Sequence, residues 1–175
     1  GSASAIDQWP DTGWGDTDCF DNSGALIACD GSEGYPGQDG SHVGPARSYT
    51  INGAQTVTDN VTGLMWVRDG DEAEGTFSWQ GAQDYITANL NGGTGFAGST
   101  DWRLPTVAEL ATLVDHSEFN PTLTDNNTTF LNSPTGTNIY YWSITERAGD
   151  NTEAWIVNFT NGQIGIPFYI DLSHT

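Results

Sequence analysis

The sequence predicts an α+β fold in which two helices pack with antiparallel sheets. Two segments, 79–90 and 106–114, carry apolar residues at helical spacing. Two groups of short strands, within 49–67 and 139–170, alternate apolar and polar side chains between turn-forming residues. Helices that lie between separate groups of strands are typical of the α+β class, and a length of 175 residues suits one domain with an extension.

Residues 1–46 are predicted to form an irregular acidic arm, and residues 47–175 the folded domain. The arm is rich in glycine and has little periodicity. Cys19 and Cys29 lie in a turn-rich stretch of the arm, where a disulfide would restrict the unfolded chain and stabilise the fold by about 3 kcal/mol. Such a pair would indicate an oxidising compartment. Two cysteines and three scattered histidines offer too few ligands for a zinc site.

The domain is expected to begin with strands. The stretch YTIN, 49–52, precedes a predicted hairpin over 55–69, whose D-N-V-T-G turn tolerates positive φ. A helix is then predicted to start after Ser78 as its N-cap and to end at Gly92 and Gly93. Its apolar positions are Ala82, Tyr85, Ile86 and Leu90.

The stretch DWRLPTVAEL predicts the start of the second helix. Pro105 is expected just inside the helix, and Thr106 and Glu109 have the spacing of a capping box. Trp102 and Leu104 precede it as expected core anchors, and Arg103 is expected to pair with a carboxylate. The apolar face of this helix is predicted to comprise Val107, Leu110, Ala111, Leu113 and Val114.

A long loop, 117–138, follows, and loops of this length in compact domains are often functional. Strands are then predicted at 139–145, 153–159 and 163–170, with a turn at Thr160–Gly162.

The charge of the chain restricts its partners. Asp and Glu number 23 against four Lys and Arg, there is no lysine, and the formal net charge is -19. A field of this sign repels phosphate backbones and anionic lipid headgroups, so nucleic-acid binding is not expected. It also opposes sulfated polysaccharides unless the four arginines converge. Neutral glycans, cationic proteins and divalent cations remain as partners, although the charge can simply keep the protein soluble.

No run approaches the roughly 18 apolar residues that cross a bilayer, so no membrane insertion is expected. Enzyme activity is not expected either. The chain has no G-x-S-x-G or H-E-x-x-H motif, and His42, His116 and His174 lie in unrelated contexts.

Acidic clusters raise the alternative of a calcium cofactor. Asp69, Asp71 and Glu74 form one cluster with Glu72, and Asp16, Asp18 and Asp21 form another. Calcium takes six to eight oxygen ligands, which such loops can supply. Neither cluster has the glycine and glutamate spacing of an EF-hand, and solvated loop charge is the competing interpretation.

A third cluster is the predicted ligand-binding site. Glu146, Asp150, Asn151 and Glu153 lie between two predicted strands, close in sequence to Trp142 and Trp155. Carboxylates and an amide can bind sugar hydroxyls directly or through calcium, while aromatic faces pack on the apolar side of a pyranose. The alternative is a polar hairpin loop with the tryptophans in the core.

The order of the motifs TVTDNVTGLMWVRD, FSWQGAQDYI, DWRLPTVAEL, YYWSIT and EAWIVNFTNGQI resembles a bacterial family. It looks like the C-terminal domain of the Legionella collagen-like adhesin, over roughly residues 47–170. The resemblance implies a C-type-lectin-like fold, also similar to that of the formylglycine-generating enzyme. It further implies a secreted or cell-surface recognition module.

Three departures limit what the resemblance carries over. The collagen-like adhesin binds glycosaminoglycans, which the lysine-free chain should repel, and the catalytic cysteines of the formylglycine-generating enzyme have no counterpart here. The expected final segment is also absent after FYIDLSHT, so a last strand can be missing. We therefore expect an extracellular module that binds a glycan or a surface protein. The alternative is a structural subunit of a surface filament or adhesin shaft that associates with its own copies.

Overall fold

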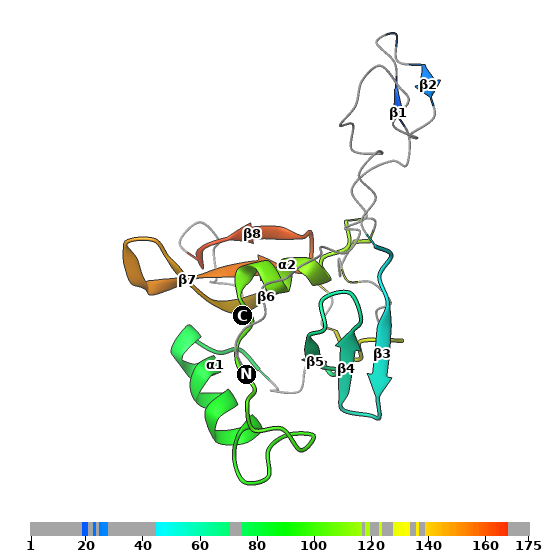
Figure 1. Cartoon of the computed structure of the whole chain (residues 1–175). Helices are drawn as coiled ribbons and strands as arrows, with labels where there is room; N and C mark the ends of the chain where they lie inside the picture. Colours follow the sequence, from blue (N-terminus) through cyan, green and yellow to red (C-terminus); the bar gives the residue numbers. More distant parts are fainter. Residues whose placement is uncertain are drawn as a thin grey trace.

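The computed structural model of the chain describes residues 19–20, 23, 25–27, 45–70, 75–116, 118–119, 123, 128–133, 136 and 139–167. It confirms the α+β class, since helices lie beside two three-stranded antiparallel sheets (Figure 1). Within these residues, no helix has both the length and the apolar character that a bilayer crossing requires.

The first sheet contains β3 (Tyr49–Asn52), β4 (Thr56–Asp59) and β5 (Met65–Val67), in that order. The predicted D-N-V-T-G turn joins β4 to β5. The Asp59 carboxylate accepts hydrogen bonds from the Val61 amide at 2.9 Å and the Thr62 hydroxyl at 2.8 Å. Gly63 has a φ of 72°, a conformation that disfavours other residues. Gly63 therefore supplies the positive φ that the sequence predicted for this turn.

The second sheet contains β6 (Tyr140–Arg147), β7 (Asp150–Asn158) and β8 (Gln163–Gly165). The β6–β7 pairing passes from Trp142↔Ile156 to Glu146↔Ala154, so β6 has extra residues in a bulge. Strand β8 is shorter than the predicted 163–170 segment, of which residues 168–170 lie outside the described part of the chain.

The first helix has two parts, α1 (Trp79–Tyr85) and the π-helical turn η2 (Ile86–Leu90). Ser78 is its N-cap, as predicted, because its hydroxyl accepts a hydrogen bond from the Gly81 amide at 3.1 Å. The π-helical turn was not predicted, because the spacing of apolar residues does not distinguish it from an α-helix.

Helix α2 (Val107–Leu113) begins with the predicted capping box. The Glu109 amide donates to the Thr106 hydroxyl at 3.2 Å, and the Thr106 amide donates to the Glu109 carboxylate at 2.7 Å. Two details differ from the prediction. Pro105 lies just before the N-cap instead of inside the first turn, and Val114 has extended backbone, so the helix ends one residue earlier.

Helix α2 joins the two sheets into one core. It packs against β6 and β7, and Val57 from β4 completes the same cluster of buried side chains (Figure 1). The buried members of this cluster are Val57, Leu110, Leu113, Val114, Leu123, Phe130, Val157 and Phe159. The segments at the surface are thus attached to a continuous apolar interior.

The described part of the arm contains a short strand pair that its composition did not predict. Strand β1 (Cys19–Phe20) pairs antiparallel with β2 (Leu26–Ile27). Cys29 lies outside the described residues, so the Cys19–Cys29 disulfide stays a prediction, as does the domain boundary after residue 46.

Candidate functional site

Tryptophan indoles attach the surface segments to the sheets. The Trp79 N–H donates to the Ser143 carbonyl at 2.9 Å, and the Trp142 N–H donates to the Phe77 carbonyl at 2.7 Å. These two bonds hold α1 and the segment before it against β6. A partly buried indole that finds a carbonyl acceptor combines apolar packing with fixed orientation. Trp142 thus holds the segment before α1 against β6.

The predicted ligand-binding cluster lies on the β6–β7 hairpin. Glu146 is in β6 and Glu153 in β7, so only Ala148 and Gly149 lie between the strands. The 146–153 segment is therefore mostly strand and not the inter-strand loop that the Gly-Asp-Asn sequence indicated. Gly149, with a φ of 86°, makes this short connection possible. Asn151 lies in β7, and its side chain is outside the described part of the structure.

The carboxylates of this hairpin differ in how readily they can contact a ligand. Glu153 is paired with Arg147 at 2.5 Å, and its side chain is only 11% exposed. Asp150 accepts hydrogen bonds from the Thr152 hydroxyl at 2.6 Å and the Thr152 amide at 2.9 Å, and these bonds lower the pKa of its carboxyl group. Glu146 is exposed. Glu146 and ionised Asp150 can thus meet a ligand, whereas Glu153 mainly holds Arg147.

The predicted calcium ligands lie mostly beyond what the structure describes. Asp69 accepts a hydrogen bond from the Asn132 amide at 2.9 Å, while Asp71 and Glu74 are outside the described residues, as is the Asp16–Asp21 cluster. Within the described ranges, no three His, Cys, Asp or Glu side chains gather as a metal site would require. A calcium site at residues 69–74 therefore stays a prediction.

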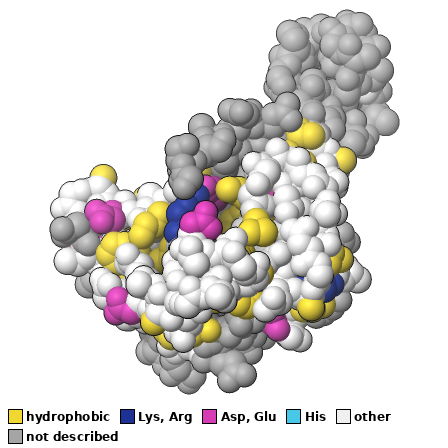
Figure 2. Space-filling view, turned by 60° about the horizontal axis from the view of Figure 1, so that its bottom comes forward, with side chains coloured by type: hydrophobic (Ala, Val, Ile, Leu, Met, Phe, Trp, Pro, Cys, Tyr) yellow, Lys and Arg dark blue, Asp and Glu magenta, His cyan; other side chains and the backbone are white. Residues whose placement is uncertain are grey.

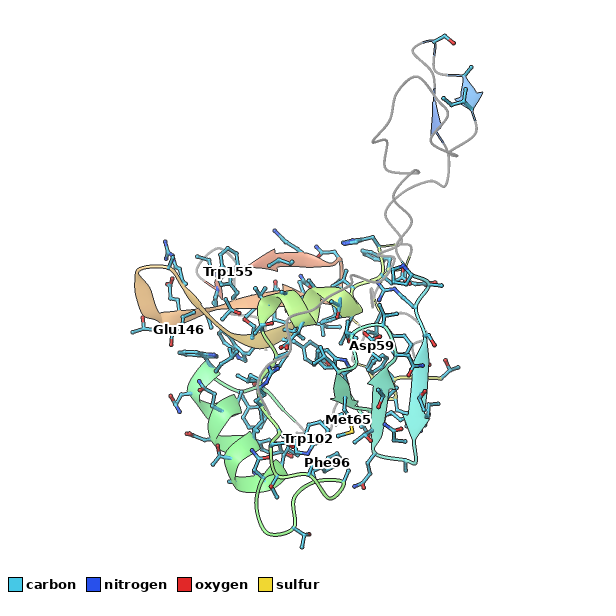
Figure 3. The ribbon with its side chains drawn as sticks, viewed as in Figure 1. Asp59, Met65, Phe96, Trp102, Glu146 and Trp155 are labelled. Carbon is cyan, nitrogen blue, oxygen red and sulfur yellow. The ribbon has the colours of Figure 1, made fainter. Side chains whose placement is uncertain are left out.

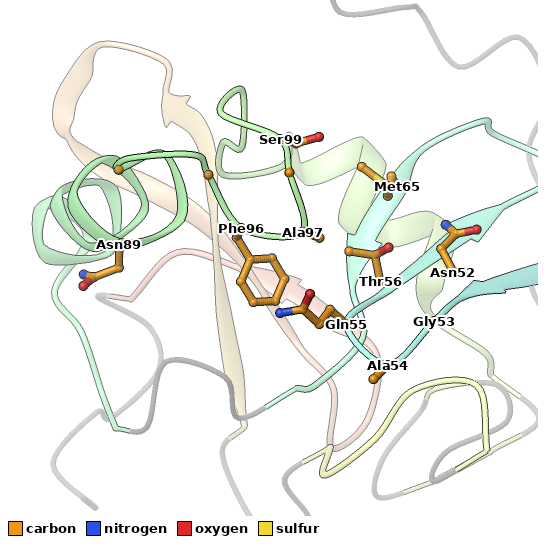
Figure 4. A pocket seen from close by; sticks show the side chains of 13 residues that line it. Asn52, Gly53, Ala54, Gln55, Thr56, Met65, Asn89, Phe96, Ala97 and Ser99 are labelled. Atoms are coloured by element: carbon orange, nitrogen blue, oxygen red, sulfur yellow. The ribbon is translucent and has the colours of Figure 1, made fainter.

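A groove that the sequence did not predict lies between the first sheet and the segment after η2. We define it by 13 described lining residues, and its volume is about 890 Å³ (Figure 4). Its lining comes on one side from β3, β4, β5 and the β3–β4 turn, and on the other from η2 and residues 92–99. The lining residues are Asn52, Gly53, Ala54, Gln55, Thr56, Met65, Asn89, Gly92, Gly95, Phe96, Ala97, Gly98 and Ser99.

The groove and the hairpin are separate surfaces. Figure 3 shows Glu146 and Trp155 on the second sheet, and Met65, Phe96 and Trp102 together at another side of the molecule. The available signal for the groove was the glycine density of the stretch GGTGFAG, 92–98. Of these glycines, the sequence predicts a role only for Gly92 and Gly93, as a helix stop, although glycine also marks close approach of a backbone to a ligand.

Comparison with known proteins gives one match. The family model described as the Lcl C-terminal domain matches residues 55–170, which is more than half of the chain. This range starts at the β3–β4 turn and includes both helices and the second sheet. No curated protein matches the chain, and no solved structure does.

Proposed function

The chain belongs to the Lcl C-terminal domain family, and from this premise we propose that it is a non-catalytic recognition module, secreted or on the cell surface. Its membership makes it an adhesin-related domain. We further propose that its ligand is a glycan or a surface protein, and that its α+β fold is of the C-type-lectin-like kind. Two helices beside two small antiparallel sheets, with an irregular segment over residues 91–105 between the helices, support this assignment.

The observation that carries the proposal is the β6–β7 hairpin. The indole hydrogen bonds fix its strand β6 to α1 and to the segment before α1, while Glu146 is exposed close to the turn. A carboxylate held at the surface of a rigid sheet can accept hydrogen bonds from sugar hydroxyls or from cationic side chains without a large ordering cost. Such contacts are weak individually, so display in several copies would raise the avidity.

A glycan and surface-protein array, run with and without calcium, tests this function. We expect a ligand whose binding weakens roughly tenfold to a hundredfold in Glu146→Ala, because a hydrogen bond to a charged carboxylate contributes about 1.5–3 kcal/mol. Asn151→Ala tests the adjacent predicted residue. Glu118→Ala is the matched control, since Glu118 is also an exposed glutamate but lies after α2.

The array also gives the results that would contradict the proposal. Failure to bind any glycan or surface protein under both conditions would remove the recognition function. Binding that is the same in Glu146→Ala, Asn151→Ala and Glu118→Ala would remove the hairpin as its site. Ligand binding that requires calcium would support calcium as the predicted cofactor.

A further inference from the structure

We infer that the groove between the β3–β4 turn and residues 92–99 is a binding site for an uncharged glycan chain. This inference rests on the proposed function and adds a second site, separate from the β6–β7 hairpin, with the class of ligand that it takes. The volume of about 890 Å³ falls within the roughly 300–1,000 Å³ of small-molecule sites.

The polar groups of the groove suit hydroxyl ligands. None of the 13 described residues that line it is charged; the polar side chains are amides and hydroxyls. Gln55 is exposed, and its side-chain amide makes no hydrogen bond with the described residues. Asn52 and Asn89 each donate one side-chain bond, to the Thr58 hydroxyl at 2.7 Å and the Tyr85 carbonyl at 3.1 Å, which leaves their amide oxygens as acceptors. Amides offer both donors and acceptors, as a sugar hydroxyl requires.

The groove also offers apolar surface. The Phe96 ring and the Gln55 side chain point toward one another across it (Figure 4). Met65, which also lines the groove, is 41% exposed, so its side chain is accessible for contact. An aromatic ring and a thioether beside amides can pack on the C–H faces of a pyranose while the amides bind its hydroxyls.

The wall formed by residues 92–99 is held in shape without a ligand. Asn91 clamps Trp102, donating to its carbonyl and accepting from its amide, both at 2.8 Å. The Trp102 indole in turn donates to the Phe96 carbonyl at 3.0 Å, and the two rings pack edge to face at 5.8 Å. Because Phe96 is already positioned, binding does not have to order this wall.

The arginines explain why the ligand should be uncharged. All four are described, and each donates to an oxygen of the chain itself. Arg103 and Arg147 pair with glutamates, and Arg47 and Arg68 donate to backbone carbonyls. None of them lines the groove. The face of the molecule in Figure 2 shows few Arg side chains, among scattered Asp and Glu and mostly uncharged atoms. A sulfate or carboxylate would therefore find no cation here, within a chain of formal net charge -19.

The test uses the full chain labelled with nitrogen-15 and four probes: cellohexaose, maltohexaose, mannohexaose and a heparin hexasaccharide. We expect at least one neutral hexasaccharide to shift the side-chain amide resonances of Gln55 and Asn89. Gln55→Ala and Asn89→Ala should each raise its Kd about twofold to tenfold. Gln163→Ala is the matched control, because this exposed glutamine lies on β8 in the second sheet and should leave the Kd unchanged.

Three results would overturn the inference. The first is no shift with any neutral hexasaccharide. The second is a neutral hexasaccharide whose Kd is unchanged in the Gln55→Ala, Asn89→Ala double variant. The third is a shift of these resonances by the heparin hexasaccharide alone. The melting temperatures of the variants show whether they fold. Glycan binding that is insensitive to the double variant would leave the recognition function in place, whereas a negative array as well would remove both.

Discussion

Gly95 sets the shape of the groove wall. It has a φ of 76°, and a Cβ atom added there would lie 1.9 Å from the Ser99 carbonyl oxygen, which is part of the backbone and cannot rotate away. An isolated antiparallel β-bridge between Phe96 and Ser99 holds the two sides of this loop together. The residue is therefore glycine for two reasons, the sign of its φ and the closeness of the facing chain.

Gly95→Ala should consequently be much more damaging than the same change at Gly93. Gly93 also has a positive φ, of 61°, but no atom lies within 4 Å of its added Cβ. We expect Gly93→Ala to cost about 1 kcal/mol for the backbone conformation alone, and Gly95→Ala to cost at least about 2 kcal/mol more because the loop must open. Urea unfolding of both variants measures the difference. Equal free energies of unfolding for the two variants would show that residues 92–99 accommodate the added Cβ atom at position 95 without an energetic cost.

Hydrogen bonds between residues close together in the sequence were predictable, whereas hydrogen bonds between residues far apart in the sequence were not. Arg103 was expected to meet a carboxylate, and it binds Glu109, six positions away, through bonds of 2.7 and 2.8 Å. Trp79 and Trp142, by contrast, each donate to a carbonyl more than 60 positions away. A single sequence carries no signal for such a pairing, because it depends on how the elements pack.

The N-terminus of α2 depends on an ion pair that should make it sensitive to acid. Hydrogen bonds from Arg103 lower the pKa of the buried Glu109 carboxyl group, with help from the Thr106 amide. Because the folded pKa lies below the unfolded value of about 4.3, the ionised pair stabilises the fold fully above that value. The stabilisation is lost as the pH falls through the folded pKa.

Glu109→Gln should show this dependence. The variant keeps the shape of the side chain but loses the charge, so we expect a loss of about 1–3 kcal/mol near neutral pH. Thermal unfolding as a function of pH measures it: the gap in Tm between the two proteins should be constant above about pH 5 and shrink below about pH 4.3. Glu118→Gln, at an exposed site, should show no such gap. A gap that is independent of pH would contradict a role for the ionised carboxylate.

At the level of elements, turn chemistry and caps were the reliable signals. The Asp59–Gly63 turn and the Thr106 capping box formed as predicted, because both depend only on residues within a few positions. The hairpin at 146–153 was misjudged, since Asp150 and Asn151 suggested a loop, whereas Ala148 and Gly149 make the turn and β7 starts directly after them. The groove was missed because its walls are more than 30 positions apart in the sequence.

At the level of the whole molecule, the charge opposes contact between copies. Each chain has a formal net charge of -19 and a pI near 4.1, so two copies repel each other strongly at neutral pH. Any surface for self-association, as a filament or shaft subunit would need, must outweigh that repulsion. Salt reduces it, because the distance over which charges act falls from about 30 Å at 0.01 M to about 3 Å at 1 M ionic strength.

The recognition function and the structural alternative thus predict different oligomeric states in sedimentation experiments. If the chain acts as a recognition module, we expect it to sediment as a monomer at pH 7 in 0.01 M salt. Association should appear, if at all, only as salt screens the charge. The same runs at constant salt with added calcium separate screening from a specific cation effect. Stable oligomers already at low salt would mean that contacts between copies outweigh the repulsion, which would favour the filament or shaft subunit over a freely acting recognition module.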